Sequence, residues 1–297
     1  MPVSVGIMLP SRETAMTGLH DARGLIAFAR VAEDAGFDSV WVGDSLLART
    51  RAEPLSVLAA VAAVTTRVAL GTAALIAPLR HPLLVAAQAA TVDQLSAGRL
   101  ILGLRSVLRR RRAAANSTRS ECRSRVAARG STRRVTLWRE TWNGQGEFAD
   151  ALPPARQGGP PVWLASGDAT KVIERVAATY DGWLPYLPDV NAYARAWDRI
   201  RAQAVREVAP ALYATVNLSG ARADDELDEY LRAYYSQPLD VMRYVQAIRG
   251  GSVAECLDWL ARYVEAGALH LILRIGSLTA GPESVAEQLL PALKEIG

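Results

Sequence analysis

Apolar and polar positions alternate along the chain in two patterns. Short, nearly continuous apolar runs are typical of strands buried on both faces, and the stretches between them carry apolar residues at helical spacing. The predicted strands are residues 3–9, 39–43, 68–76, 100–104, 161–165, 182–187, 212–218 and 270–275. The predicted helices are residues 25–35, 54–64, 82–95, 135–142, 169–179, 192–208 and 283–296, with 224–266 mostly helical but broken at Pro238 and Gly250-Gly251.

Eight strands alternating with helices favour a parallel sheet, and a chain of this length suits one (β/α)₈ barrel. We therefore predict an α/β fold, a TIM barrel, as a single domain over residues 1–297. The alternative is a doubly wound open sheet. That fold usually carries a G-x-G-x-x-G turn after its first strand, and the turn here, LPSRETAMTG, has none.

The formal net charge of +4 is misleading, because one segment carries most of the basic residues. Residues 105–134 hold eleven Arg and a single acid, Glu121, so this segment is +10 and the rest of the chain is −6. We therefore expect neither a nucleic-acid partner nor a membrane partner. Two cysteines exclude a disulfide scaffold, and no signal peptide or long apolar span is visible, so we expect a cytoplasmic protein without a bound metal.

In a barrel of this kind, the active site lies at the carboxyl ends of the strands. Asp44-Ser45 ends the second strand, and either contacts a bound ring or caps a turn. Ser166-Gly167-Asp168 joins a strand to the helix predicted at 169–179, and such a turn suits a phosphate group or is a plain helix cap. Gly103, near the end of the fourth strand, is a further candidate for cofactor binding. No catalytic triad order or Walker-type loop appears.

Several stretches resemble the bacterial luciferase-like monooxygenase family, and within it the actinobacterial branch that uses the deazaflavin coenzyme F420. The resemblance rests on FDSVWVGDSLL (37–47), the run from 53 to 104 that contains VALGTAALIAPLRHP, PVWLASGDATKVIERVAATYDGWLP (161–185) and SVAECLDWLARYVEAGALHLILRIG (252–276). It covers most of the chain except residues 105–134.

The resemblance implies roles for particular residues. It makes Asp44 a contact of the cofactor ring and places Ser45, the one candidate catalytic position, where related sugar-phosphate dehydrogenases carry a catalytic histidine. It makes Thr72, Ala73 and Ala74 a strand bulge that supports the ring and contains a non-proline cis peptide. The same comparison makes Ser166, Gly167 and Asp168 the loop that receives the cofactor phosphate. We expect Asp168 itself to turn inward and cap the following helix.

The leading hypothesis for the function is hydride transfer between coenzyme F420 and a small organic substrate. The alternatives are a monooxygenase that uses reduced FMN and a catalytically impaired barrel that serves as a binding or assembly protein. The apolar surfaces of residues 55–64 and 83–92 predict a homodimer. Residues 105–134 are interpreted either as the product of two compensating frameshifts, which would remove a wall of the cofactor site, or as a genuine basic loop.

Overall fold

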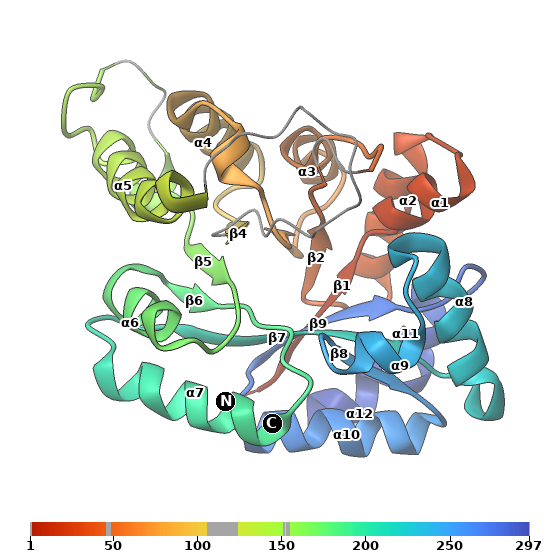
Figure 1. The fold of residues 1–297 in the computed structure, drawn as a ribbon. Helices are drawn as coiled ribbons and strands as arrows, with labels where there is room; N and C mark the ends of the chain where they lie inside the picture. Colours follow the sequence, from red (N-terminus) through yellow and green to blue (C-terminus); the bar gives the residue numbers. More distant parts are fainter. Residues whose placement is uncertain (1, 46–48, 106–123, 151, 153–154, 297) are drawn as a thin grey trace, which may run out of the picture.

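A computed structural model describes residues 2–45, 49–105, 124–150, 152 and 155–296 (Figure 1). Within these residues the strands are β1 (Ser4–Met8), β2 (Ser39–Val42), β3 (Ala69–Thr72), β4 (Leu100–Arg105), β5 (Val162–Ala165), β6 (Gly182–Trp183), β7 (Ala209–Asn217), β8 (Ala247–Gly250) and β9 (His270–Ile275). The helices are α1 (Ser11–Thr17), α2 (Ala22–Asp34), α3 (Pro54–Ala62), α4 (Pro82–Leu95), α5 (Ser124–Trp142), α6 (Thr170–Thr179), α7 (Val190–Gln203), α8 (Ala223–Tyr235), α9 (Leu239–Arg243), α10 (Val253–Glu265), α11 (Pro282–Gln288) and α12 (Leu290–Glu295).

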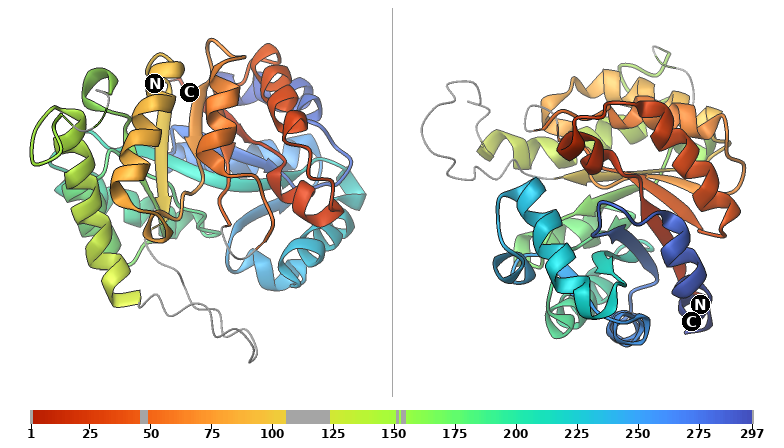
Figure 2. Two further views of the ribbon diagram at one scale, coloured as in Figure 1. Left: turned by 90° about the horizontal axis from the view of Figure 1, so that it is seen from above. Right: turned by 90° about the vertical axis from the view of Figure 1, so that its right-hand side faces the viewer.

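Every pair of neighbouring strands in the described sheet is parallel, and the sheet closes on itself. The hydrogen-bonded order runs β6-β5-β4-β3-β2-β1-β9-β7-β8, and β6 also pairs with β7. Eight strands, β1 to β7 and β9, therefore form a closed barrel with helices around it (Figure 2). This confirms the predicted TIM barrel and excludes the open sheet.

Two indole rings in the barrel interior pack over glycines. Trp41 on β2 and Trp163 on β5 lie with ring centroids 5.4 Å apart. A Cβ atom at Gly71 would lie 2.0 Å from the Trp41 ring, and one at Gly182 would lie 2.4 Å from the Trp163 ring. Large and small side chains on adjacent strands thus complement each other in the barrel interior.

The ninth strand, β8, corrects the sequence prediction. Residues 224–266 read as mostly helical, but β8 pairs with the carboxyl half of β7, and the Ala247 N–H donates to the carbonyl of Tyr186 beyond β6. Four residues ending at a Gly-Gly pair are too short to show a strand period, so the pattern showed only a helix break there. Ser252 and Glu255 form a capping box that starts α10.

The Arg-rich segment is only partly described. Residues 106–123 lie outside the described residues, and the segment from Ser124 onward forms the first turns of α5, which begins well before the predicted start at residue 135.

The amino and carboxyl ends of the chain lie side by side in all views (Figures 1 and 2). Among the helices that the structure describes, none combines the length and apolar character needed to cross a bilayer.

Candidate active site

The end of β3 forms a bulge at the carboxyl end of the barrel, which we call the barrel mouth. The Ala73 N–H donates to the carbonyl of Val42 at 2.8 Å, and hydrogen bonding to β4 resumes where Leu75 N–H donates to the carbonyl of Gly103 at 2.8 Å. The peptide between Ala73 and Ala74 is cis, as the sequence predicted. Both alanines are half-buried, so they offer a small, flat surface at the mouth.

Thr72 and Gly103 lie behind this bulge and join β3 to β4. The Thr72 hydroxyl donates to the Gly103 carbonyl at 2.8 Å, and the Thr72 side chain is fully buried. A Cβ atom at position 103 would lie 2.0 Å from the Thr72 carbonyl oxygen, so only glycine allows the strands to approach this closely. The predicted contact of Thr72 and Gly103 with a cofactor stays a prediction. In the structure, these two residues hold β3 against β4 behind the bulge.

The Asp44 carboxylate holds the segment that follows the bulge. It accepts hydrogen bonds from the backbone N–H of Ile76 at 2.8 Å and from Arg80 at 2.5 Å. Arg80 also pairs with Glu53 at 3.1 Å. The side chains of Asp44 and Arg80 are 2% and 9% exposed, so this is a buried ion pair. Asp44 therefore has a structural role next to the ring site predicted for it.

Ser45 lies at the same strand end, but its hydroxyl is directed into its own loop. Ser45 Oγ donates to the carbonyl of Arg49 at 3.0 Å, and the residue is 9% exposed. The hydroxyl thus holds the loop after β2 in place. Nothing in the described contacts of Ser45 gives it the proton-transfer role of a histidine, and its predicted catalytic role stays a prediction.

The turn before α6 is open, and its predicted cap is wrong. The helix begins at Thr170, its N-cap is Ala169, and no side chain of the described residues caps it. Asp168 is exposed and lies one residue too early to cap, because the helix starts later than the predicted residue 169. An uncapped helix start leaves backbone N–H groups available to an anion.

Space and charge around this turn also suit an anion. No heavy atom of the described residues other than its chain neighbours lies within 4 Å of the place a Gly167 Cβ would take. Lys171 lies in the first turn of α6, and the side chain of Arg199 donates to the Thr170 hydroxyl at 3.2 Å. Ser166, Gly167 and Asp168 are therefore brought together at one open, partly basic turn.

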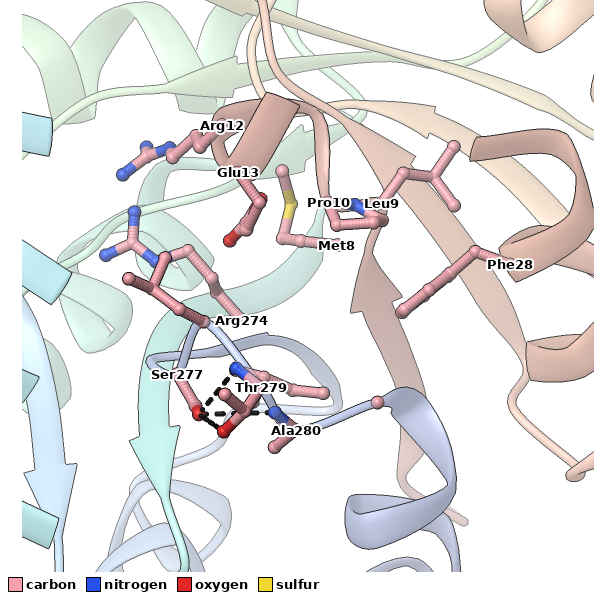
Figure 3. Close-up of a pocket in the computed structure, with 13 residues that line it drawn as sticks. Met8, Leu9, Pro10, Arg12, Glu13, Phe28, Arg274, Ser277, Thr279 and Ala280 are labelled. Atoms are coloured by element: carbon pink, nitrogen blue, oxygen red, sulfur yellow. Dashed lines mark hydrogen bonds between the residues drawn. The ribbon is translucent and has the colours of Figure 1, made fainter. Parts of the chain in front are cut away.

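A second group at the barrel mouth was not predicted from the sequence. It lines a cavity of about 210 Å³ between the ends of β1 and β9, where the head groups of Arg12, Glu13 and Arg274 come together on one side (Figure 3). Leu9 and Phe28 form part of the apolar side of the same cavity. We use the name basic pocket for Arg12, Glu13 and Arg274 together with three residues that do not line the cavity but adjoin them: Tyr213 and Tyr230, whose rings lie against Arg274, and Arg51, which shares the Tyr234 ring with Arg12.

Tyrosine rings surround the arginines of the basic pocket. The Arg12 guanidinium lies 4.7 Å from the ring centroid of Tyr234 and donates to the hydroxyl of Tyr235. Arg51 lies 4.9 Å from the Tyr234 ring and donates to its hydroxyl. Arg274 lies 5.4 Å from the ring of Tyr213. These contacts are cation–π interactions and hydrogen bonds to neutral hydroxyl groups, which stabilise the cations without neutralising them.

The charges of the basic pocket are unbalanced. Among the described residues, no carboxylate lies within 4.0 Å of Arg12, Arg51 or Arg274, and Glu13 instead accepts a hydrogen bond from the Tyr230 hydroxyl. Burial raises the pKa of the Glu13 carboxyl, and the hydrogen bond from Tyr230 offsets only part of that change. Burial, and after it the charge of Arg12, lowers the pKa of Arg51. The pocket is thus a partly buried site with excess positive charge, in which Arg274 is the most deeply buried arginine.

One feature of the sequence could have pointed to this pocket. Arg274 is a charged residue inside the apolar strand β9, and it is only 2% exposed. A charge in a buried strand needs a partner or a function. The tyrosines and the other arginines carry no such signal, because they come from elements far apart in the chain: α1, the loop after β2, β7 and α8.

A search of protein-family models matches residues 3–297 to the family described as "Luciferase-like monooxygenase". The chain belongs to this family. The match extends over nearly the whole barrel, including the bulge at Ala73-Ala74 and the turn before α6.

Curated relatives of this luciferase-like chain match only in part. One is an F420-dependent glucose-6-phosphate dehydrogenase from Beutenbergia cavernae, 44% identical over 90 residues, which is 28% of this chain and 27% of that protein. Another is the oxygenase component of a flavin-dependent trigonelline monooxygenase from Acinetobacter baylyi, 27% identical over 160 residues, which is 48% of this chain and 43% of that protein. The chain therefore spans less than half the length of these relatives.

The fold agrees with that of a solved structure. The coenzyme F420-dependent tetrahydromethanopterin reductase from Methanopyrus kandleri superposes with a TM-score of 0.73 over 99% of this chain and 100% of that one, at 16% identity. The luciferase-like relatives thus include both F420-dependent oxidoreductases and flavin monooxygenases. In the described part of the chain, no group of three His, Cys, Asp or Glu residues is placed to hold a metal ion.

Proposed function

We propose that this chain is an oxidoreductase that transfers hydride between coenzyme F420 and a small organic substrate. The proposal is supported by family membership and by the relative from Beutenbergia cavernae, whose name gives it F420 as cofactor. The observation that carries it is the open turn at Ser166-Gly167-Asp168, next to the uncapped start of α6. A bound phosphate group requires open space and free backbone N–H groups, whereas a turn that only caps a helix requires neither.

The residues at the mouth fit a flat ring with a phosphate-bearing chain. Ala73 and Ala74 would support the ring, because their small side chains leave a flat, half-buried surface. The N–H groups at the start of α6 would hold the phosphate, and the absence of a side chain at Gly167 would let it approach the backbone. The coenzyme, when bound, supplies the hydride chemistry, and the protein supplies position and electrostatics.

The test is a titration of wild-type protein and a Gly167→Val variant with coenzyme F420 and with FMN. The valine side chain enters space that no described neighbour occupies, so the fold should be unchanged while the phosphate is obstructed. We expect the dissociation constant to rise at least tenfold, about 1.4 kcal/mol. The matched control is Gly24→Val, since no described heavy atom lies within 4 Å of the Gly24 Cβ position in α2 either.

The outcomes distinguish the candidate functions. Binding of F420 that weakens only in Gly167→Val supports the proposal. Binding of FMN alone favours the reduced-FMN monooxygenase, which the relative from Acinetobacter baylyi suggests. Binding of neither cofactor favours the impaired barrel. Wild-type affinity of Gly167→Val for both cofactors would mean that the phosphate site lies elsewhere.

A further inference from the structure

We propose that the basic pocket binds an anionic group of the substrate, a carboxylate or a phosphate. The inference rests on the proposed function, because it assigns the substrate class of that same site. It is carried by the unbalanced charges, by donors without partners, and by the position of the pocket beside the bulge.

The charge balance requires a counter-ion. Arg12, Arg51 and Arg274 bring three positive charges together. Among the described residues, the pocket contains one carboxylate, that of Glu13. Arg274 is 2% exposed, so water stabilises it poorly. Buried charges are normally paired, and a bound anion would provide the missing partner.

Polar atoms without partners identify the donors. The Nε–H groups of Arg12, Arg51 and Arg274 are buried, and none has a hydrogen-bond partner within the described structure. The hydroxyl of Tyr213 is likewise unpartnered, although the residue is nine-tenths buried. Unsatisfied buried donors are rare in native proteins and each one needs an explanation. Guanidinium groups favour carboxylate and phosphate oxygens, which fit their planar fork.

The position of the pocket connects this anion to the reacting centre. The Cβ position of Gly43 lies 2.6 Å from Arg51 Nη1 and 3.6 Å from the Ala73 carbonyl oxygen, so Arg51 is adjacent to the bulge. The cavity wall opposite the arginines includes Leu9 and Phe28. A small organic molecule with an apolar body and one anionic end matches both walls. The cavity of about 210 Å³ lies below the range of drug-sized sites.

The test uses the full chain without coenzyme and two simple probes, inorganic phosphate and acetate. Thermal unfolding is followed at increasing probe concentration and constant ionic strength, because an anion that binds only the folded state raises the unfolding temperature. We expect a saturable rise for the wild type and a dissociation constant at least tenfold weaker for Arg12→Gln. The control, Arg23→Gln, removes the same charge from an exposed arginine and should respond like the wild type.

A second variant separates lost binding from lost folding. Arg12→Lys keeps the positive charge but loses the planar fork and its Nε–H, so its response to phosphate should lie between those of Arg12→Gln and the wild type. A response to phosphate alone identifies a phosphate ester as substrate, and a response to acetate alone identifies a carboxylic acid. The proposal is overturned if neither probe stabilises the wild type, or if Arg12→Gln responds as the wild type does.

Titration with coenzyme F420 separates this inference from the proposed function. If the pocket serves the substrate, Arg12→Gln should bind the coenzyme within about twofold of wild type. A loss of coenzyme affinity equal to the loss of phosphate affinity would show that the arginines hold the coenzyme instead, and would overturn the inference. Failure of the wild type to bind any coenzyme contradicts only the proposed function, since the anion titration contains none.

Discussion

The buried pair of Asp44 and Arg80 allows a quantitative test of whether Asp44 braces the bulge or contacts the cofactor. At the observed 2.5 Å, two unit charges attract each other by about 7 kcal/mol at an effective dielectric of 20. Desolvation cancels most of this attraction, and removal of one partner from a buried pair costs about 3–5 kcal/mol. Glu53 remains beside Arg80 when Asp44 is replaced, so Asp44→Asn should cost less, about 2–3 kcal/mol.

The converse substitution should be more destabilising. Arg80→Met removes the Arg80 guanidinium from the Asp44 carboxylate, which is 2% exposed, and should cost about 3–5 kcal/mol. The double variant should cost clearly less than the sum, because the two substitutions remove one shared interaction.

The measurement is unfolding in urea, followed by tryptophan fluorescence and by circular dichroism to check that the two transitions coincide. The same variants are titrated with coenzyme. A bracing role predicts a large loss of stability for Asp44→Asn. The reasoning fails if Asp44→Asn changes stability by less than about 1 kcal/mol but weakens coenzyme binding tenfold, since Asp44 would then act on the ligand directly.

Four further predictions follow from single sites. Gly71→Ala places a methyl group 2.0 Å from an indole atom and should lower stability by about 1–3 kcal/mol, measured as a shift of the urea midpoint. Burial pushes the pKa of Glu33 upward, but hydrogen bonds from three consecutive backbone N–H groups outweigh it and hold that pKa below 4.5. Glu33→Gln should therefore lower the unfolding temperature above about pH 5, and the difference should vanish as the pH falls through the lowered pKa. Burial raises the pKa of Cys256 to about 11, so in a Cys122→Ser background a thiol reagent at pH 8 should react only after unfolding. We propose that the protein forms a homodimer through α3 and α4, where Leu84 is 55% exposed. Light scattering should then show a dimer for the wild type and a monomer for Leu84→Glu, and a monomeric wild type would contradict the proposal.

The barrel could be predicted from the sequence because its signals are local. Each long strand is a continuous apolar run and each helix has its own period, so the alternation was visible without any knowledge of contacts. Where the sequence pattern predicted an element wrongly, the element was too short to show a period, or the strand it pairs with was too distant in the chain. Strand β8 has four residues, and β6 has only Gly182–Trp183, although the apolar run extended to residue 187. Hydrogen bonding to β7, and not local composition, decides where these strands end.

The candidate site was only partly predictable, and the reason differs between its parts. The bulge at Ala73-Ala74 and the open turn at Gly167 lie on short motifs, so resemblance could locate them. The role of Asp168 was wrong because a one-residue shift of a helix start changes which side chain can cap it. The role of Asp44 depends on Arg80, which is 36 residues away in the chain and reaches back beneath the bulge.

The basic pocket is an extreme case of the same dependence on distant contacts. Arg12 meets Tyr235 across 223 positions, and Arg51 meets Tyr234 across 183, so no motif contains both partners. The barrel brings them together because strand ends converge at one mouth, whatever their distance along the chain. Local patterns therefore identify the scaffold of a luciferase-like barrel. Of the three arginines of the basic pocket, Arg274 lies on β9, Arg12 on α1 and Arg51 in the loop after β2, and only the closed fold shows that no carboxylate of the described residues lies within 4.0 Å of them.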